Sequence, residues 1–179
     1  MTRLDIFAAV FLTCSGSLSA QSAPPLRLEK TILLPEVQGR IDHLSIDTKQ
    51  QRLFVAALGN NTVEVIDLKA GKLAHSIPGL SEPQGVLYVP AVDRLFVANA
   101  KDGTVRIFDG TSFKLLKNVS YSDDADNLRL DSASGTVYVG YGSGALGAID
   151  KDGGKIGDIR LDAHPESFQL EKEGPRIFV

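Results

Sequence analysis

The 179-residue sequence has one cysteine, no tryptophan and no run of basic residues. With a formal net charge of −3, it lacks the positive patch that nucleic-acid-binding surfaces require. It also lacks the Gly-x-Ser-x-Gly and His-Glu-x-x-His patterns of common hydrolases and zinc proteases. These absences argue against nucleic acid as a partner and against those two enzyme classes.

The N-terminus has the layout of a secretory signal peptide. Arg3 precedes a nine-residue apolar run from Ile6 to Cys14, and small residues follow. This run is about half the roughly 20 residues that a membrane-spanning helix needs. We therefore predict a signal peptide over residues 1–20, with a cut as late as residue 23, and a periplasmic or secreted protein with no permanent membrane span. Removal of Cys14 with the signal would leave no disulfide and no thiolate metal site.

A repeat is the strongest pattern in the chain. The tetrapeptide Arg-Leu-Phe-Val begins at residues 52 and 94, and related tetrapeptides begin at residues 136 and 176, at intervals of 42, 42 and 40 residues. A short apolar strand precedes each tetrapeptide, and an aspartate ends a further strand after the first three. Turn-forming Gly and Asn residues separate the segments. Each full unit therefore predicts four short strands.

Units of about 42 residues with four strands each are typical of a β-propeller, whose blades bury their faces against one another. A β-sandwich would show similar strand spacing without a repeating four-strand unit. We predict an all-β partial propeller of about 3.5 blades from a seven-bladed parent. The expected blades lie near residues 39–80, 81–121, 122–162 and 163–179, and residues 26–34 are expected to form an N-terminal closing strand.

The repeated strands resemble those of the YVTN-repeat β-propellers, the YncE-like group of exported bacterial proteins. The resemblance rests on Leu-Phe-Val-Ala-Ala and Leu-Phe-Val-Ala-Asn, with Asn-Thr-Val-Glu-Val-Ile-Asp and Gly-Thr-Val-Arg-Ile-Phe-Asp after them. The third unit fits less well because glycines replace several side chains. The resemblance implies the fold but no single activity, since relatives are described as binding proteins, DNA-associated proteins, lactonases or lyases.

Polar residues recur in the loops that lead into the first strand of each blade. In a propeller these loops surround one mouth of the central channel, so equivalent side chains converge there. Asp42, Gln84, Asp126 and Glu166 share one register of the repeat. The candidate ligand-binding residues at this mouth are Arg40, Asp42, His43, Gln84, Asp124, Asp126, Asn127, His164 and Glu166.

Carboxylates and imidazoles that converge in this way suit a divalent cation. Asp42, His43, Asp126 and Glu166 are the candidate metal ligands. Their oxygen atoms suit Ca²⁺ or Mg²⁺, and the histidine would also accept Zn²⁺ or Fe²⁺. The competing interpretation is that these residues only hydrate the mouth and bond to strand-end amides.

The sequence favours a scaffold that binds a protein or a small molecule and assigns it no reaction. One alternative is a metal-assisted enzyme of the lactonase or lyase type, with its site at the channel mouth. A crowded carboxylate there would serve as its general base. A DNA-associated propeller is a second alternative, and the acidic mouth and net negative charge disfavour it.

Overall fold

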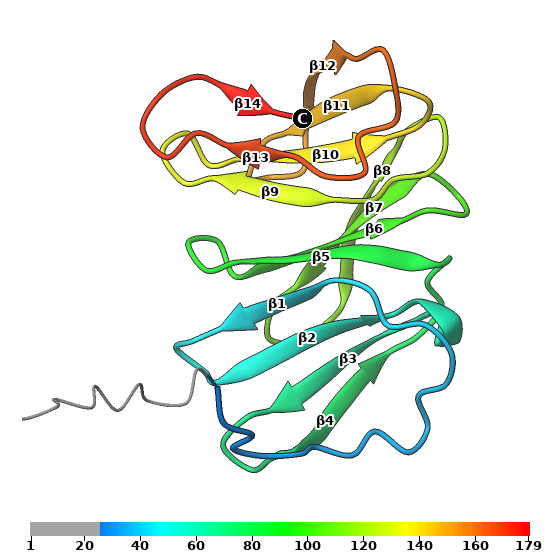
Figure 1. Ribbon diagram of the computed structural model, residues 1–179, viewed down its shortest axis with the longest axis vertical. Helices are drawn as coiled ribbons and strands as arrows, with labels where there is room; N and C mark the ends of the chain where they lie inside the picture. Colours follow the sequence, from blue (N-terminus) through cyan, green and yellow to red (C-terminus); the bar gives the residue numbers. More distant parts are fainter. Residues whose placement is uncertain (1–25) are drawn as a thin grey trace, which may run out of the picture. The chain divides into compact units, whose positions relative to one another are not determined.

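The computed structural model describes residues 26–179 (Figure 1). The predicted signal peptide over residues 1–20, its later cut at residue 23 and Cys14 lie outside the described residues. Residues 32–179 form one compact unit. No helix in the described part of the chain is both long and apolar enough to span a membrane.

The described chain is all-β, as predicted. Three sheets have four antiparallel strands each, in the order of the sequence, and a fourth sheet has two strands. The first sheet contains β1 (Leu44–Asp47), β2 (Arg52–Ala57), β3 (Thr62–Asp67) and β4 (Lys72–Ile77), with a 3-10 turn at Leu58–Asn60. The second contains β5 (Pro83–Val89), β6 (Arg94–Asn99), β7 (Thr104–Asp109) and β8 (Leu115–Ser120). The third contains β9 (Leu128–Asp131), β10 (Thr136–Tyr141), β11 (Ala145–Ile149) and β12 (Lys155–Arg160), and the fourth contains β13 (Gln169–Leu170) and β14 (Ile177–Phe178).

Aspartates at the end of the third strand of each full sheet, or directly after it, stabilise the turns that follow. The Asp67 carboxylate accepts a hydrogen bond from the Ala70 N–H at 2.8 Å, and the Asp109 carboxylate accepts one from the Ser112 N–H at 2.7 Å. Asp150 accepts one from the Gly154 N–H at 2.7 Å. These local bonds satisfy turn amides that lie outside the strand ladder, so each aspartate helps to end its strand.

Neighbouring sheets pack face to face through apolar side chains. Phe54 and Val65 of the first sheet pack with Leu95 and Phe108 of the second. On the opposite face of β6, Phe96 packs with the third sheet. Leu95 and Phe96 are both fully buried, because alternate residues of a strand point to opposite faces and both faces of this sheet are covered. Together these sheets form a partial β-propeller.

The first strands of successive blades lie beside one another. β1 contacts β5, β5 contacts β9, and β9 contacts β13. Figure 1 shows these four strands following one another from cyan to red. Backbone hydrogen bonds repeat with the blades: Asp42 N donates to Ala56 O, and Asp126 N donates to Gly140 O, both at 2.9 Å. Loop residues two repeats apart therefore occupy the same backbone position.

Residues 26–34, which the pattern predicts as a strand, form no strand in the structure. A strand needs a partner for its backbone groups, and no sheet of the described residues pairs with this segment. The first blade also has an uncovered face. Leu44 of β1 is 56% exposed, whereas its repeat equivalents Val86 and Leu128 are 5% and 4% exposed.

Candidate functional site

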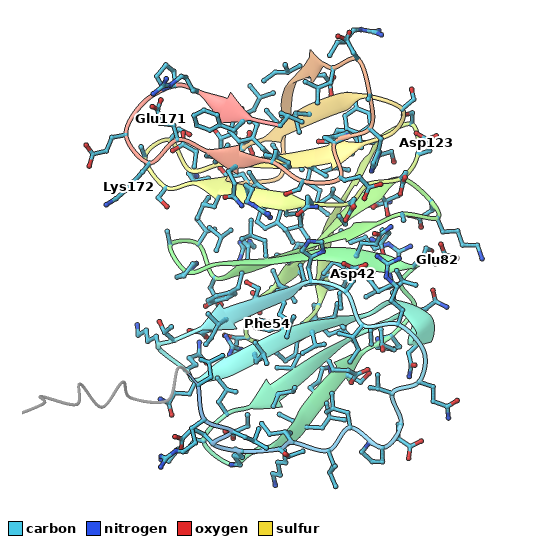
Figure 2. All side chains as sticks on the ribbon, viewed as in Figure 1. Asp42, Phe54, Glu82, Asp123, Glu171 and Lys172 are labelled. Atoms are coloured by element: carbon cyan, nitrogen blue, oxygen red, sulfur yellow. The ribbon has the colours of Figure 1, made fainter. Side chains whose placement is uncertain are left out.

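The candidate site lies where loops lead into the first strands of the blades. Figure 2 labels Glu82, which precedes β5, and Asp123, which precedes β9, at one end of the sheets. Glu171 and Lys172 are labelled at the other end. The loops before β5 and β9 therefore lie at the same end of the sheets.

Blade one contributes a charged group to this mouth. Arg40 Nη2 donates to Asp42 Oδ2 at 2.5 Å, and His43 Nδ1 lies 2.7 Å from Asp42 Oδ1. The same His43 nitrogen lies 4.0 Å from Asp126 Oδ1 of blade three. The His43 nitrogen is buried and has no aligned hydrogen-bond partner among the described residues. His43 thus brings blade one close to Asp126.

Asp126 is the most deeply buried carboxylate of the mouth. Its side chain comes from the loop before β9, and the residue is 5% exposed. Oδ1 has no hydrogen-bond partner among the described residues, an uncommon state for a buried polar atom. Burial raises the pKa of Asp126 to about 6; the nearby Asp42 and Asp124 carboxylates raise it further, and His43 and His164 oppose the shift. Asp126 is therefore a buried acceptor that a bound cation would stabilise in its ionised form.

His164 approaches Asp126 from the segment before β13. Its Nδ1 lies 2.5 Å from Gly142 O and 3.8 Å from Asp124 Oδ2. A carbonyl oxygen only accepts hydrogen bonds, so Nδ1 carries the proton in this contact. Nε2 is then the nitrogen with a free lone pair, which is the usual arrangement of a metal-binding histidine held by a backbone carbonyl.

Three of these residues have the geometry of a cation site. Potential ligand atoms of Asp126, His164 and Glu166 all lie within 4.8 Å of one another. Glu166 is exposed, and its backbone carbonyl accepts a hydrogen bond from the buried Asn127 amide, which ties the fourth blade to the third. The spacing is compatible with Ca²⁺, which takes oxygen ligands at about 2.3–2.6 Å, and the imidazole suits Zn²⁺.

Blade two has the uncharged Gln84 in the register of Asp42 and Asp126 and contributes backbone contacts there. The Gln84 carbonyl accepts a hydrogen bond from His43 N at 3.3 Å. The next residue, Gly85, lies directly against blade three, since a Cβ there would be 2.1 Å from Asp126 O. The backbone of blade two therefore contacts the mouth loops of both blade one and blade three.

The structure gathers the predicted residues into two groups that meet at Asp126. One group is Arg40, Asp42 and His43, and the other is Asp124, His164 and Glu166. The predicted metal set was Asp42, His43, Asp126 and Glu166, and the cluster contains only Asp126 and Glu166 of these. His164 supplies the imidazole in place of His43, and Asp42 is engaged by Arg40 instead.

Sequence reasoning missed two residues at this site. Gly142 supplies the carbonyl that orients His164, and backbone contacts of this kind have no sequence signal. Arg129 of β9 lines a small cavity beside the first strands, where the repeat equivalents are Ser45 and Leu87. The signal in the sequence was a charged residue in a first strand at a position that is uncharged in the two preceding units.

Comparison with known proteins supports the fold. No family model matches the sequence, and no curated protein matches it. Among solved structures, the chain is similar to hydrazine synthase of Kuenenia stuttgartiensis, with a TM-score of 0.72 and 18% identity. The similarity covers 84% of this chain and 44% of that chain, so this chain spans less than half of that protein's length. At this identity the similarity concerns the fold alone.

Proposed function

We propose that this chain is an exported, YVTN-like propeller scaffold that binds a ligand at its channel mouth, and that a divalent cation forms part of this site. One observation carries the proposal: the buried Asp126 oxygen has no partner, and the side chains of His164 and Glu166 meet at the same carboxylate. A buried, unpaired carboxylate costs free energy. A cation at this position would offset that cost.

The contributions of separate blades support a binding role. His43 comes from blade one, Asp126 from blade three and His164 from the start of blade four. Packed sheets hold these loops, so the ligand atoms need little rearrangement on binding. Preorganisation of this kind lowers the entropic cost of binding.

Calorimetric titration of the chain with Ca²⁺, Mg²⁺ and Zn²⁺ tests the proposal. We expect one of these ions to bind, and Asp126→Asn and His164→Gln to weaken its binding at least tenfold. Asp152→Asn is the matched control, because this exposed carboxylate lies in the β11–β12 turn, outside the cluster. The proposal is wrong if no ion binds, or if Asp126→Asn binds the ion as tightly as the parent chain.

Metal-assisted hydrolysis of the lactonase type is a second candidate function, and the several ionisable groups beside the cluster favour it. The Asp124 carboxylate lies 3.8 Å from His164, close enough to the proposed cation site to accept a proton there as a general base. The test is hydrolysis of dihydrocoumarin by the cation-loaded chain. Turnover that Asp126→Asn abolishes and Asp152→Asn preserves supports an enzyme. Cation binding without turnover of this lactone leaves the scaffold function as the better account.

A further inference from the structure

A small cavity adjoins the mouth and runs along the first strands of the blades. It has a volume of about 190 Å³ and is lined by residues 43–45, 85–87 and 128–130. His43 belongs to this lining, and its Nδ1 lies 4.0 Å from Asp126 Oδ1, so the cavity lies next to the candidate cation site. This volume is below the roughly 300–1,000 Å³ that is typical of pockets for drug-sized ligands. The cavity therefore suits a ligand of few non-hydrogen atoms.

Arg129 is the one permanently charged residue of this lining. It is half-buried, and its guanidinium carbon lies 5.6 Å from the centre of the Phe168 ring. Nη1 donates to Leu128 O at 2.8 Å. Among the described residues, no carboxylate forms an ion pair with Arg129, although a guanidinium has five N–H donors. Most of its hydrogen-bonding capacity is therefore free.

The fold itself does not require an arginine at this position. The repeat equivalents are Ser45, whose hydroxyl accepts a hydrogen bond from Tyr88 N at 2.9 Å, and Leu87, which packs against the core. Burial lowers the pKa of Arg129, and the nearby Asp126 opposes this shift. The Arg129 guanidinium is half-buried and has no ion-pair partner among the described residues, and the other two blades that line the cavity have uncharged residues at this position. This arrangement indicates recognition of an anion.

We infer that the ligand is a short organic carboxylate that lies between the proposed cation and Arg129. This inference rests on the proposed cation site. One carboxylate oxygen would bind the cation at Asp126, His164 and Glu166. A second anionic group of the ligand would accept the free N–H groups of Arg129. Asp126 and Arg129 are three residues apart in the chain, so their Cα atoms are at most about 10 Å apart, a span that a small dicarboxylate and the two side chains bridge.

The planar guanidinium favours a carboxylate over a spherical anion. Two parallel N–H groups match the two oxygens of a carboxylate, and the Phe168 ring holds the guanidinium plane in place. Apolar residues, Leu44, Leu87 and Leu130 among them, share the cavity lining with Arg129. Methylene groups between two carboxylates would contact these side chains.

The experiment uses malonate as the probe and its neutral diamide, malonamide, as the ligand control. The chain is first titrated with Ca²⁺ alone, and the Ca²⁺-loaded chain is then titrated with each probe, with a correction for Ca²⁺–malonate association in solution. Arg129→Met is the test variant, because Met keeps a flexible apolar chain over Phe168. Arg160→Met is its matched control, because it removes one exposed charge from β12 of the same blade.

We expect malonate to bind and malonamide not to bind. Arg129→Met should weaken malonate binding at least tenfold and leave the Ca²⁺ affinity within twofold, and Arg160→Met should change neither. If Ca²⁺ binds but malonate binds no better than malonamide, or binds Arg129→Met equally well, the inference is wrong and the cation site stands. Preference for inorganic phosphate over malonate also overturns it. If none of Ca²⁺, Mg²⁺ and Zn²⁺ binds and malonate does not bind either, both this inference and the proposed cation site are wrong.

Discussion

Gly85 of blade two lies so close to Asp126 of blade three that a Cβ at residue 85 would be 2.1 Å from the Asp126 carbonyl oxygen. The contacting atom belongs to the backbone and cannot rotate away. Gly85→Ala should therefore separate the two blades at the mouth and cost about 1–3 kcal/mol of stability, the usual range for overpacking. Urea unfolding measures the loss, and calorimetry should show weaker cation binding.

Gly157→Ala provides the control for this prediction. Gly157 lies in β12, and a Cβ there would meet no atom within 4 Å. Replacement of a strand glycine by alanine removes flexibility from the unfolded chain, so stability should rise by about 0.5–1 kcal/mol. Equal effects of the two substitutions would contradict the proposed close approach of the blades.

Asp126 should make the metal-free chain less stable as the pH rises. Its pKa is about 6 in the folded chain, above the ordinary value of 3.8, so the folded state binds the proton more tightly than the unfolded state does. Stability from this group is therefore present at pH 4 and is lost as the pH rises through 6. In the presence of a chelator, Asp126→Asn should melt at a higher temperature than the parent chain at pH 8. The difference should close by pH 4, and a constant difference across this range would refute the assignment.

Cation binding should weaken in acid for the same reason. Below pH 6 the cation must displace a proton from Asp126, so the apparent dissociation constant should rise about tenfold per pH unit. Competition titrations between pH 5 and 7.5 measure this slope. An affinity that stays constant over this interval would show that Asp126 is not a ligand.

Asn127 should matter for both stability and binding. Its buried amide donates to the Glu166 carbonyl, and Asn127→Ala removes that donor. We expect a loss of about 1–2 kcal/mol, typical of a broken partly buried hydrogen bond, and a lower cation affinity because Glu166 is less well positioned. Asn118→Ala, on the exposed strand β8, should change neither quantity. Weakened binding without a change in unfolding would place the role of Asn127 in the site alone.

The fold was predictable because the repeated sequence pattern reflects how each strand packs and where each turn forms. The neighbouring apolar residues Leu95 and Phe96 point to opposite faces of β6, so a sheet must pack against each face. The aspartates at the ends of the third strands indicated where those strands end. The segment 26–34 had the same apolar pattern and forms no strand, because a pattern does not supply the partner that a strand needs.

Only the site residues that occupy equivalent positions of the repeat could be predicted from the sequence. Asp42 and Asp126 occupy equivalent backbone positions, as the repeat indicated. The position of His164 depends on the path of the loop before β13 and on a bond to Gly142 O, and no periodicity describes either feature. The free guanidinium of Arg129 became apparent only when the neighbouring strands were placed around it.

The turn aspartates have a consequence for how such a chain evolves. Asp67, Asp109 and Asp150 each accept hydrogen bonds from amides only two to four residues ahead, so contacts within the hairpin stabilise the turn between the third and fourth strands of each full sheet. Duplication or deletion of one four-stranded blade therefore leaves the turns of the other blades unchanged. Ring size can therefore drift between lineages while each blade keeps its shape.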